Sequence, residues 1–302
     1  MNTNRISLKQ IAECLVIITC LIFSTCAVAE DLFHQQTLRI GFHRPSFHEY
    51  SREDLVISVK IITEEMGKDL GIETNVAIYE DMKLMNADFE NGTINLIFAS
   101  PLLIANEVDN TLLADGFKMI PSGGNADRLV ILTRKNEGMD NFKSLRNKKL
   151  GLVENDPTSD LYVNFLSQSN FKKDFQDTLK KMPREKKSHQ VILKLFFGQI
   201  DVTCVYESFF QTTTELNPQI LERVQIIEHI DGILQSAGFF HKNVDPAFRE
   251  SVINAVLKLN TYPRGQQFLE IFKTEEALPV SPSELTITKK LFNDYQHLKT
   301  IK

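Results

Sequence analysis

DFENGTINLIFASPL, residues 88–102, shares its layout with a second stretch, LFFGQIDVTCVYESF, at residues 195–209. In each stretch a predicted helix ends in glycine, an apolar strand follows, and a polar residue begins the next helix. The pattern Gly92-Thr-Ile-Asn95 in the first stretch corresponds to Gly198-Gln-Ile-Asp201 in the second. Two ordinary strand–helix units can share a layout by coincidence, but the matching glycine and Asn/Asp positions favour two similar lobes in tandem.

Short apolar strands alternate with amphipathic helices from residue 37 onward. The first half contains expected strands at 37–42, 76–79 and 95–99 and expected helices at 51–71 and 81–92. In the longer helix the apolar residues recur every three or four positions, and Gly71 follows its end. Strands that alternate with helices are typical of a parallel α/β sheet with right-handed crossovers.

The pattern restarts in the second half of the chain. Expected strands lie at 128–135, 148–153, 201–206 and 224–229, expected helices begin at Pro157 and His189, and the tail 246–302 is mostly helical. Segments near 125–135 and 232–241 are expected to cross between the lobes. We therefore expect an α/β bilobal protein with lobe 1 at 30–130, completed by 240–302, and lobe 2 at 131–239.

Residues 1–29 have the pattern of a cleaved secretory signal peptide. Arg5 and Lys9 precede the 15-residue apolar run 15–29, which ends in the small-x-small sequence Ala27-Val28-Ala29. The run is shorter than the roughly 20 residues of a membrane-spanning helix. Phe23 and Thr25 fit a lipidation motif at Cys26 poorly. Cleavage before Glu30 predicts a soluble exported protein.

The composition of the remaining chain excludes several classes of function. Loss of Arg5, Lys9 and Glu13 from the 34 basic and 39 acidic residues leaves 32 and 38, a net charge of −6. No basic cluster indicates nucleic-acid binding. Cys204 is the one cysteine left after cleavage, so no disulfide framework is possible, and its apolar strand indicates a core position. His34, His43 and His48 lack zinc-type spacing, and we expect no metal or cofactor.

Polar residues follow several of the expected strands. In open α/β sheets, ligands bind in a crevice at the carboxyl ends of the strands. The residues at these positions are His43 after the first strand, Ser100 after 95–99, the turn 156–159, and Tyr206 with Glu207. Ser100 before Pro101 also reads as an ordinary helix cap, so the functional interpretation depends on two lobes presenting such turns to one cleft.

The order of these segments resembles the phosphate/phosphite/phosphonate-binding proteins of ABC importers, which have the type 2 periplasmic-binding-protein fold. The resemblance rests on LRIGF, GTINLIFASPLLIA, RLVILTRKNEGMDNFKSLRNKKLGLV, the Asp-Pro-Thr-Ser turn, SHQVILKLFFGQIDVTCVY and DPAFRESVINAVLKLN, and covers roughly residues 37–295. It implies two Rossmann-like lobes around a ligand cleft.

The resemblance also implies ligand-binding residues. The family's hydroxyl cluster maps to Thr158 and Ser159, its histidine to His189, and its ligand-facing turns to Ser100 and to Tyr206 with Glu207. Thr158 and Ser159 have a structural alternative, satisfying the free amides of a first helical turn, and His189 has the alternative of an exposed first-turn residue.

The sequence departs from the family at this turn. The family commonly has Asp-Pro-x-Ser-x-Ser-Gly, whereas Asp160 and Leu161 follow Asp-Pro-Thr-Ser here. The missing glycine removes a close backbone approach to an oxyanion, and the carboxylate of Asp160 is expected to repel a bound anion. The departure leaves open a cation-bearing phosphonate, a carboxylate or another small solute.

The leading hypothesis is a monomeric periplasmic solute-binding protein that closes on a small, anionic, phosphonate-, phosphite- or phosphate-like ligand and delivers it to an importer permease. The alternative is a ligand sensor that presents its closed form to a signalling receptor. A hydrolase using Ser159, His189 and Glu207 is a distant third, because no nucleophile elbow, Cys-x-x-Cys or phosphate loop supports it. The sequence therefore predicts that the chain is not an enzyme.

Overall fold

Two mixed β-sheets organise the chain in the computed structural model, which describes residues 36–47, 49–122 and 127–300. The expected signal peptide lies outside these residues. The first sheet has the order β11-β4-β10-β3-β1-β2, with β1 Thr37–His43, β2 Glu73–Tyr79, β3 Leu96–Ala99, β4 Leu113–Pro121, β10 Ala237–His241 and β11 Thr274–Val280. The second has the order β7-β6-β8-β5-β9, with β5 Arg128–Arg134, β6 Lys149–Gly151, β7 Lys180–Lys181, β8 Val202–Tyr206 and β9 Val224–Asp231.

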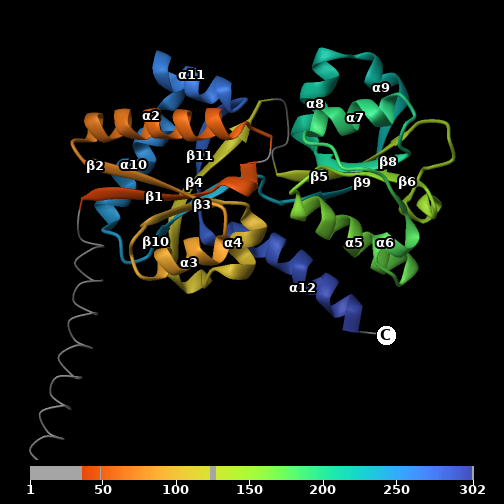
Figure 1. Cartoon of the computed structure of the whole chain (residues 1–302), viewed down its shortest axis with the longest axis horizontal. Coiled ribbons are helices and arrows are strands. Elements are labelled where there is room, and N and C mark those ends of the chain that lie inside the picture. The colour runs from red at the N-terminus through yellow and green to blue at the C-terminus, as the bar shows by residue number, and fades with distance from the viewer. Residues whose placement is uncertain (1–35, 48, 123–126, 301–302) are drawn as a thin grey trace, which may run out of the picture.

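Helices cover both faces of each sheet (Figure 1). The first lobe carries η1 Arg44–Phe47, α2 Arg52–Leu70, α3 Met82–Glu90, α4 Pro101–Glu107, η2 Asn110–Leu112, α10 Pro246–Leu257, η4 Leu259–Thr261, α11 Pro263–Ile271 and η5 Pro282–Leu285. The second carries η3 Phe142–Leu145, α5 Pro157–Phe171, α6 Phe175–Thr178, α7 Ser188–Phe196, α8 Glu207–Leu216 and α9 Gln219–Arg223. The bilobal α/β architecture expected from the sequence is confirmed.

The expected parallel pairing is found for β1 with β2 and β3 and for β6 with β7 and β8, but both sheets also contain antiparallel pairs. Strand β10 pairs antiparallel with β3 and β4, and β5 pairs antiparallel with β8 and β9. The reason is the exchange of chain between lobes. Strand β5 enters the second sheet from the first lobe, and β10 returns to the first sheet from the second lobe. Each of these two strands therefore runs antiparallel to its neighbours in the sheet that it joins.

Two strands of the first sheet, β4 and β11, were not expected from the sequence. Strand β4 contains Gly116 and ends at Pro121, and β11 contains two glutamates and Pro279, so neither has the alternating apolar pattern of a strand. Proline within a strand is tolerated at a sheet edge, and β11 is the edge strand beyond β4.

The repeated glycine motif forms the same local structure in both lobes. The backbone N–H of Arg39 in β1 donates to Asn95 Oδ1 at 2.8 Å, and the backbone N–H of Lys149 next to β8 donates to Asp201 Oδ2 at 2.8 Å. Gly92 and Gly198 both have the left-handed φ, 81° and 74°, that ends the preceding helix. The sequence echo is therefore a structural repeat that ties β1 to the start of β3 in the first lobe and β6 to the start of β8 in the second.

The C-terminal helix α12, Thr286–Thr300, extends beneath both lobes (Figure 1). Leu291 and Tyr295 belong to the apolar core of the second lobe, together with Leu102 of α4 from the first. The Tyr295 hydroxyl donates to Asp174 Oδ1 at 3.0 Å. Residues 240–302 were expected to complete lobe 1, whereas the last fifteen described residues pack on the second lobe because their apolar face covers α5.

Candidate ligand-binding cleft

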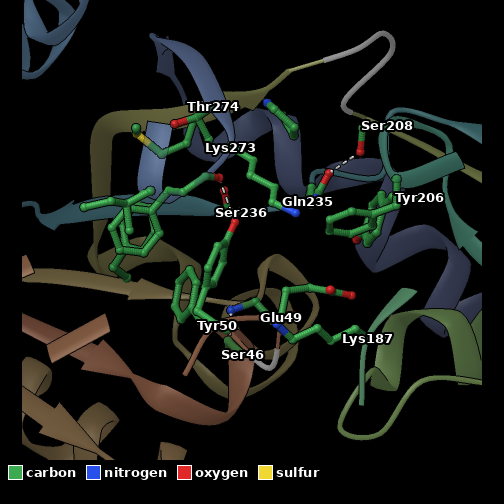
Figure 2. Close-up of a pocket in the computed structure, with 18 of the residues that line it drawn as sticks. Ser46, Glu49, Tyr50, Lys187, Tyr206, Ser208, Gln235, Ser236, Lys273 and Thr274 are labelled. Atoms are coloured by element: carbon green, nitrogen blue, oxygen red, sulfur yellow. Dashed lines mark hydrogen bonds between the residues drawn. The ribbon is translucent and has the colours of Figure 1, made fainter. Parts of the chain in front are cut away.

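A cavity of about 1200 Å³ lies between the two lobes. Its polar lining comes from the ends of β1 and β3, the start of α5, the starts of α7 and α8, the crossing segment at Gln235 and Ser236, and the junction of α11 with β11. Figure 2 shows side chains of both lobes, among them Glu49, Lys187 and Ser208, around one space. The cavity thus lies at the carboxyl ends of β1 and β3 and beside the interlobe crossings.

The first-lobe side of the cleft contains a hydrogen-bonded chain that starts at His43. The His43 ring nitrogen Nδ1 lies 2.7 Å from the Ser46 hydroxyl, which accepts the backbone N–H of Ser100 at 2.8 Å. Burial lowers the pKa of His43, against the opposing effect of Glu80 and Asp81. His43 and Ser100 both line the cavity, and the Ser100 hydroxyl makes no capping bond to α4.

The turn before α5 separates Thr158 from Ser159. Asp156 caps the helix by accepting the backbone N–H of Ser159 at 3.1 Å, and it also accepts the Ser159 hydroxyl at 2.5 Å. Ser159 is fully buried and lies outside the cavity lining, whereas Thr158 lines the cavity. The expectation that both hydroxyls face the cleft therefore holds for Thr158 alone, because the Ser159 hydroxyl is used by the helix cap.

Asp160, which the sequence marked as a repulsive charge, is paired with Arg184. Both carboxylate oxygens of Asp160 accept hydrogen bonds from Arg184 Nη2 at 2.8 Å. Burial raises the pKa of Asp160 above its usual value, and Arg184 opposes this shift. Because Arg184 compensates the charge, the departure from the family turn places a neutral ion pair, rather than a lone carboxylate, in the cleft wall.

The start of α7 brings His189 to the cavity and binds a carboxylate from the opposite lobe. Glu49 Oε1 accepts the backbone N–H of Ser188 at 2.8 Å and its hydroxyl at 2.6 Å. Burial lowers the pKa of His189, and Lys273 and Lys187 lower it further, against the opposing effect of Glu49. The imidazole is therefore held toward its neutral form beside two ammonium groups.

The start of α8 contributes Ser208 rather than Glu207. Tyr206 lines the cavity, and its hydroxyl donates to the carbonyl oxygen of Leu234 in the crossing segment at 3.0 Å. Glu207 lies outside the lining and pairs with Arg128 at 3.3 Å. The Ser208 hydroxyl donates to Gln235 Oε1 at 3.0 Å, the dashed contact between these side chains in Figure 2.

Three cationic side chains in the lining were missed by sequence reasoning. Lys187 and Lys273 extend into the space around Glu49 in Figure 2, and Arg184 lines the cavity beside Asp160. Lys187 directly precedes Ser188 and His189, so its position could have been inferred with theirs. Lys273 lies after α11, far along the chain, and only the fold brings it to the cleft.

Metal-ligating side chains do not cluster in the described part of the cleft. The described ranges contain no group of three or more His, Cys, Asp or Glu side chains arranged to hold a metal ion. His34 and His48 lie outside the described residues. In the part of the chain that the structure describes, no helix is both long enough and apolar enough to cross a membrane. The arrangement of hydroxyls, amides and ammonium groups suits reversible binding of a polar solute.

A family model described as the periplasmic substrate-binding protein of the phosphonate ABC transporter matches residues 47–285. None of the curated proteins matches the chain. Among solved structures, XAC2383 from Xanthomonas citri, bound to chloride, has a TM-score of 0.60 at 14% identity and covers 88% of this chain and 99% of its own.

Two phosphonate-transport proteins have similar scores. PhnD1 from Prochlorococcus marinus, in complex with methylphosphonate, has a TM-score of 0.58 at 12% identity, with 86% of this chain and 98% of that chain covered. A binding protein component of an ABC phosphonate transporter from Pseudomonas aeruginosa has a TM-score of 0.58 at 11% identity, covering 87% and 88%. These likenesses establish the type 2 periplasmic-binding-protein fold. The family and these two structures are transport binding proteins and not enzymes, as predicted.

Proposed function

Because this chain belongs to the family of periplasmic substrate-binding proteins of ABC phosphonate transporters, we propose that it captures a small, phosphonate-like anion between its lobes for an importer permease. The observation that carries the proposal is the lining of the cleft, where hydroxyl groups from both lobes meet the ammonium groups of Lys187 and Lys273. Charge-assisted hydrogen bonds from such groups are the usual means of holding phosphoryl oxygens.

Four hydroxyl groups line the cleft around the space for the head group of the ligand, and two of them, Ser46 and Ser208, would exchange or share their present hydrogen-bond partners on binding. Ser46 and Ser100 come from the first lobe, and Thr158 and Ser208 come from the second. An anion that bonds to members of both pairs favours the closed arrangement of the lobes, because an open cleft leaves one pair too distant. Ligand binding and lobe closure are then thermodynamically coupled, because the ligand shifts the population toward the closed state.

Closure is expected at the two crossings between the lobes. The backbone N–H of Ile233 in the returning crossing donates to the carbonyl oxygen of Asp127 in the outgoing one at 3.0 Å. Rotation at these short segments changes the cleft, and the packing of α12 and Leu102 on the second lobe must accommodate it. The closed monomer would then be the form that the permease recognises.

A ligand screen tests the proposal. The purified protein is heated with phosphate, phosphite, methylphosphonate, aminoethylphosphonate, acetate or ethylamine, and the hits are measured by calorimetry. A ligand that binds only the folded protein raises its Tm with concentration. We expect at least one phosphonate or phosphite to raise the Tm. A shift with ethylamine alone would overturn the assignment of an anionic ligand.

A further inference from the structure

The cavity continues from the polar cleft into the interior of the first lobe. Beyond His43 and Ser100 its lining is mostly apolar, with Ile40, Phe42, Phe98 and Phe117 on one face of the first sheet and Val59 and Met66 on the facing side of α2, where Thr63 is a polar exception. We call this inner part the apolar chamber and define it by these six residues. It belongs to the same continuous cavity of about 1200 Å³ as the cleft.

The polar and apolar ends of the cavity follow from the strands themselves. Phe42 directly precedes His43 at the end of β1, and Phe98 lies two residues before Ser100 at the end of β3. Each strand thus carries a cleft-facing polar group at its carboxyl end and a chamber-facing ring just inside it. A molecule lying along these strands meets polar groups first and aromatic rings behind them.

The aromatic wall of the chamber is held by contacts among its own rings. The rings of Phe42 and Phe98 stack with centroids 5.2 Å apart, and Phe47 packs on Phe42 at 4.2 Å. Phe117 extends the wall from Phe98 at 5.6 Å. Such mutual packing keeps the wall in place without a ligand, so the chamber is a preformed surface rather than a gap between mobile side chains.

The volume of about 1200 Å³ covers the polar cleft and the apolar chamber together. Pockets for drug-sized ligands measure roughly 300–1000 Å³, and protein interiors are otherwise packed with few voids larger than a water molecule. A head group bound among the hydroxyls and ammonium groups of the cleft leaves the chamber for another part of the same molecule. An apolar substituent fits its chemistry, because the six defining side chains offer no hydrogen-bonding group.

We propose that the ligand is an amphiphile, an organic anion whose head lies in the polar cleft and whose alkyl or aryl substituent fills the apolar chamber. The proposal rests on the proposed function for its anionic head. The chamber itself is independent of the head group, and the experiment separates the two.

Chain-length dependence of affinity is the direct test. Calorimetry with methyl-, butyl-, hexyl- and octylphosphonate keeps the head constant while the apolar part grows. Burial of each added methylene should tighten Kd about fourfold until the chamber is full. The same series is repeated with alkylcarboxylates and alkylamines. Each ligand is used at concentrations below its critical micelle concentration.

A variant that fills the chamber supplies the structural control. Val59 is 5% exposed and faces the chamber, whereas Ile57, two residues earlier on α2, is 57% exposed on the outer face. Val59→Phe should flatten the chain-length dependence and leave the shortest ligand bound, and Ile57→Phe should retain the dependence. If Val59→Phe fails to fold, Val59→Thr places a hydroxyl in the same position at similar volume and should weaken long chains selectively.

The outcomes distinguish this proposal from the proposed function. Tightening along the phosphonate series supports both, and tightening along the amine series alone supports the chamber while overturning the anionic head. Binding of methylphosphonate without tightening on chain extension overturns the chamber and leaves the anion site standing. Absence of binding by every member of every series overturns both.

Discussion

Glu49 of the first lobe caps helix α7 of the second, its carboxylate oxygen Oε1 lying 2.8 Å from the backbone nitrogen of Ser188 and 2.6 Å from the Ser188 hydroxyl oxygen. The start of a helix attracts negative charge because its first amides lack partners within the helix. A side chain of the protein therefore occupies an amide position that an anionic ligand could otherwise use. The contact joins the lobes, so separation of the lobes is expected to break it.

Removal of this charge should strengthen the binding of an anion. Glu49→Gln keeps an oxygen that can accept from Ser188 but removes the repulsion between the carboxylate and a ligand in the same cavity. At the effective dielectric of a cleft, charges several ångströms apart interact by roughly 1 kcal/mol, about a fivefold change in Kd. Calorimetry with the best phosphonate measures it, with Glu53→Gln on the exposed start of α2 as the control. Weaker binding by Glu49→Gln would show that the carboxylate supports the ligand.

The ammonium group of Lys187 should contribute directly to anion affinity. Lys187→Ala is expected to raise Kd for a phosphonate about tenfold, since a charge-assisted hydrogen bond is worth roughly 1.5 kcal/mol or more. The adjacent Lys186 is exposed and lies outside the cavity lining, so Lys186→Ala is a control of the same composition. If Lys187→Ala and Lys186→Ala raise Kd equally, the net charge of the protein, rather than a direct contact, determines the affinity. In that case added salt should weaken anion binding to the same extent in both variants.

Thr158 and Ser159 should have separable roles. Thr158→Val removes a hydroxyl from the cavity lining and should weaken ligand binding severalfold with a small change in Tm. Ser159→Ala removes the hydroxyl that donates to Asp156 and should lower the free energy of unfolding by about 1 kcal/mol without changing Kd. Calorimetry and thermal unfolding of both variants give the comparison. A loss of affinity in Ser159→Ala at unchanged stability would contradict this division.

The pairing of Asp160 with Arg184 predicts a pH-dependent stability. Arg184→Met should cost roughly 1–2 kcal/mol at neutral pH, because a partly buried carboxylate loses its partner. The folded-state pKa of Asp160 is already raised by burial, and loss of Arg184 raises it further. A carboxyl whose pKa is higher in the folded state destabilises the fold above that pKa, so the cost should shrink as the pH falls through it.

Urea unfolding of Arg184→Met between pH 4 and pH 7 measures this cost. The double variant Asp160→Asn with Arg184→Met removes the unpaired charge and should recover most of the stability at pH 7. A cost of the single variant that stays constant with pH would indicate that Arg184 acts by packing alone.

The sequence predicted the local elements better than their pairing. Strands such as 37–42 and the helix capped by Gly71 follow from periodicity and cap residues, which are local properties. The antiparallel direction of β10 and the edge position of β11 depend on the exchange of chain between lobes. No pattern within ten residues contains that information.

The candidate site was predicted in part for the same reason. His43, Ser100, Thr158, His189 and Tyr206 line the cavity because each follows a strand or starts a helix, a position that the sequence reveals. Ser159 and Glu207 lie at similar positions, but their side chains are used by Asp156 and Arg128. Glu49 and Lys273 reach the cleft from segments without a recognisable motif.

The two polar residues of the repeated motif, Asn95 and Asp201, make different hydrogen bonds, so substitutions at them should change stability by different amounts. Asn95 is fully buried and uses both ends of its amide, since Oδ1 accepts from Arg39 and Nδ2 donates to the carbonyl oxygen of Thr37 at 2.8 Å. Asp201 accepts at both oxygens, from the backbone of Lys149 and from Arg134 at 3.1 Å. Burial alone would raise the pKa of Asp201, but these two donors outweigh it and lower the pKa.

Asn95→Asp should therefore be much more damaging than Asp201→Asn. The first change points a buried carboxylate at the Thr37 carbonyl oxygen and should cost roughly 3 kcal/mol or more at pH 7, whereas the second loses one charged partner and should cost about 1 kcal/mol. At low pH a protonated Asp at position 95 can donate to Thr37, so the cost of Asn95→Asp should fall as the pH is lowered. Urea unfolding at pH 7 and pH 4.5 tests both expectations, and equal costs at pH 7 would contradict the different hydrogen-bonding roles of the two repeats.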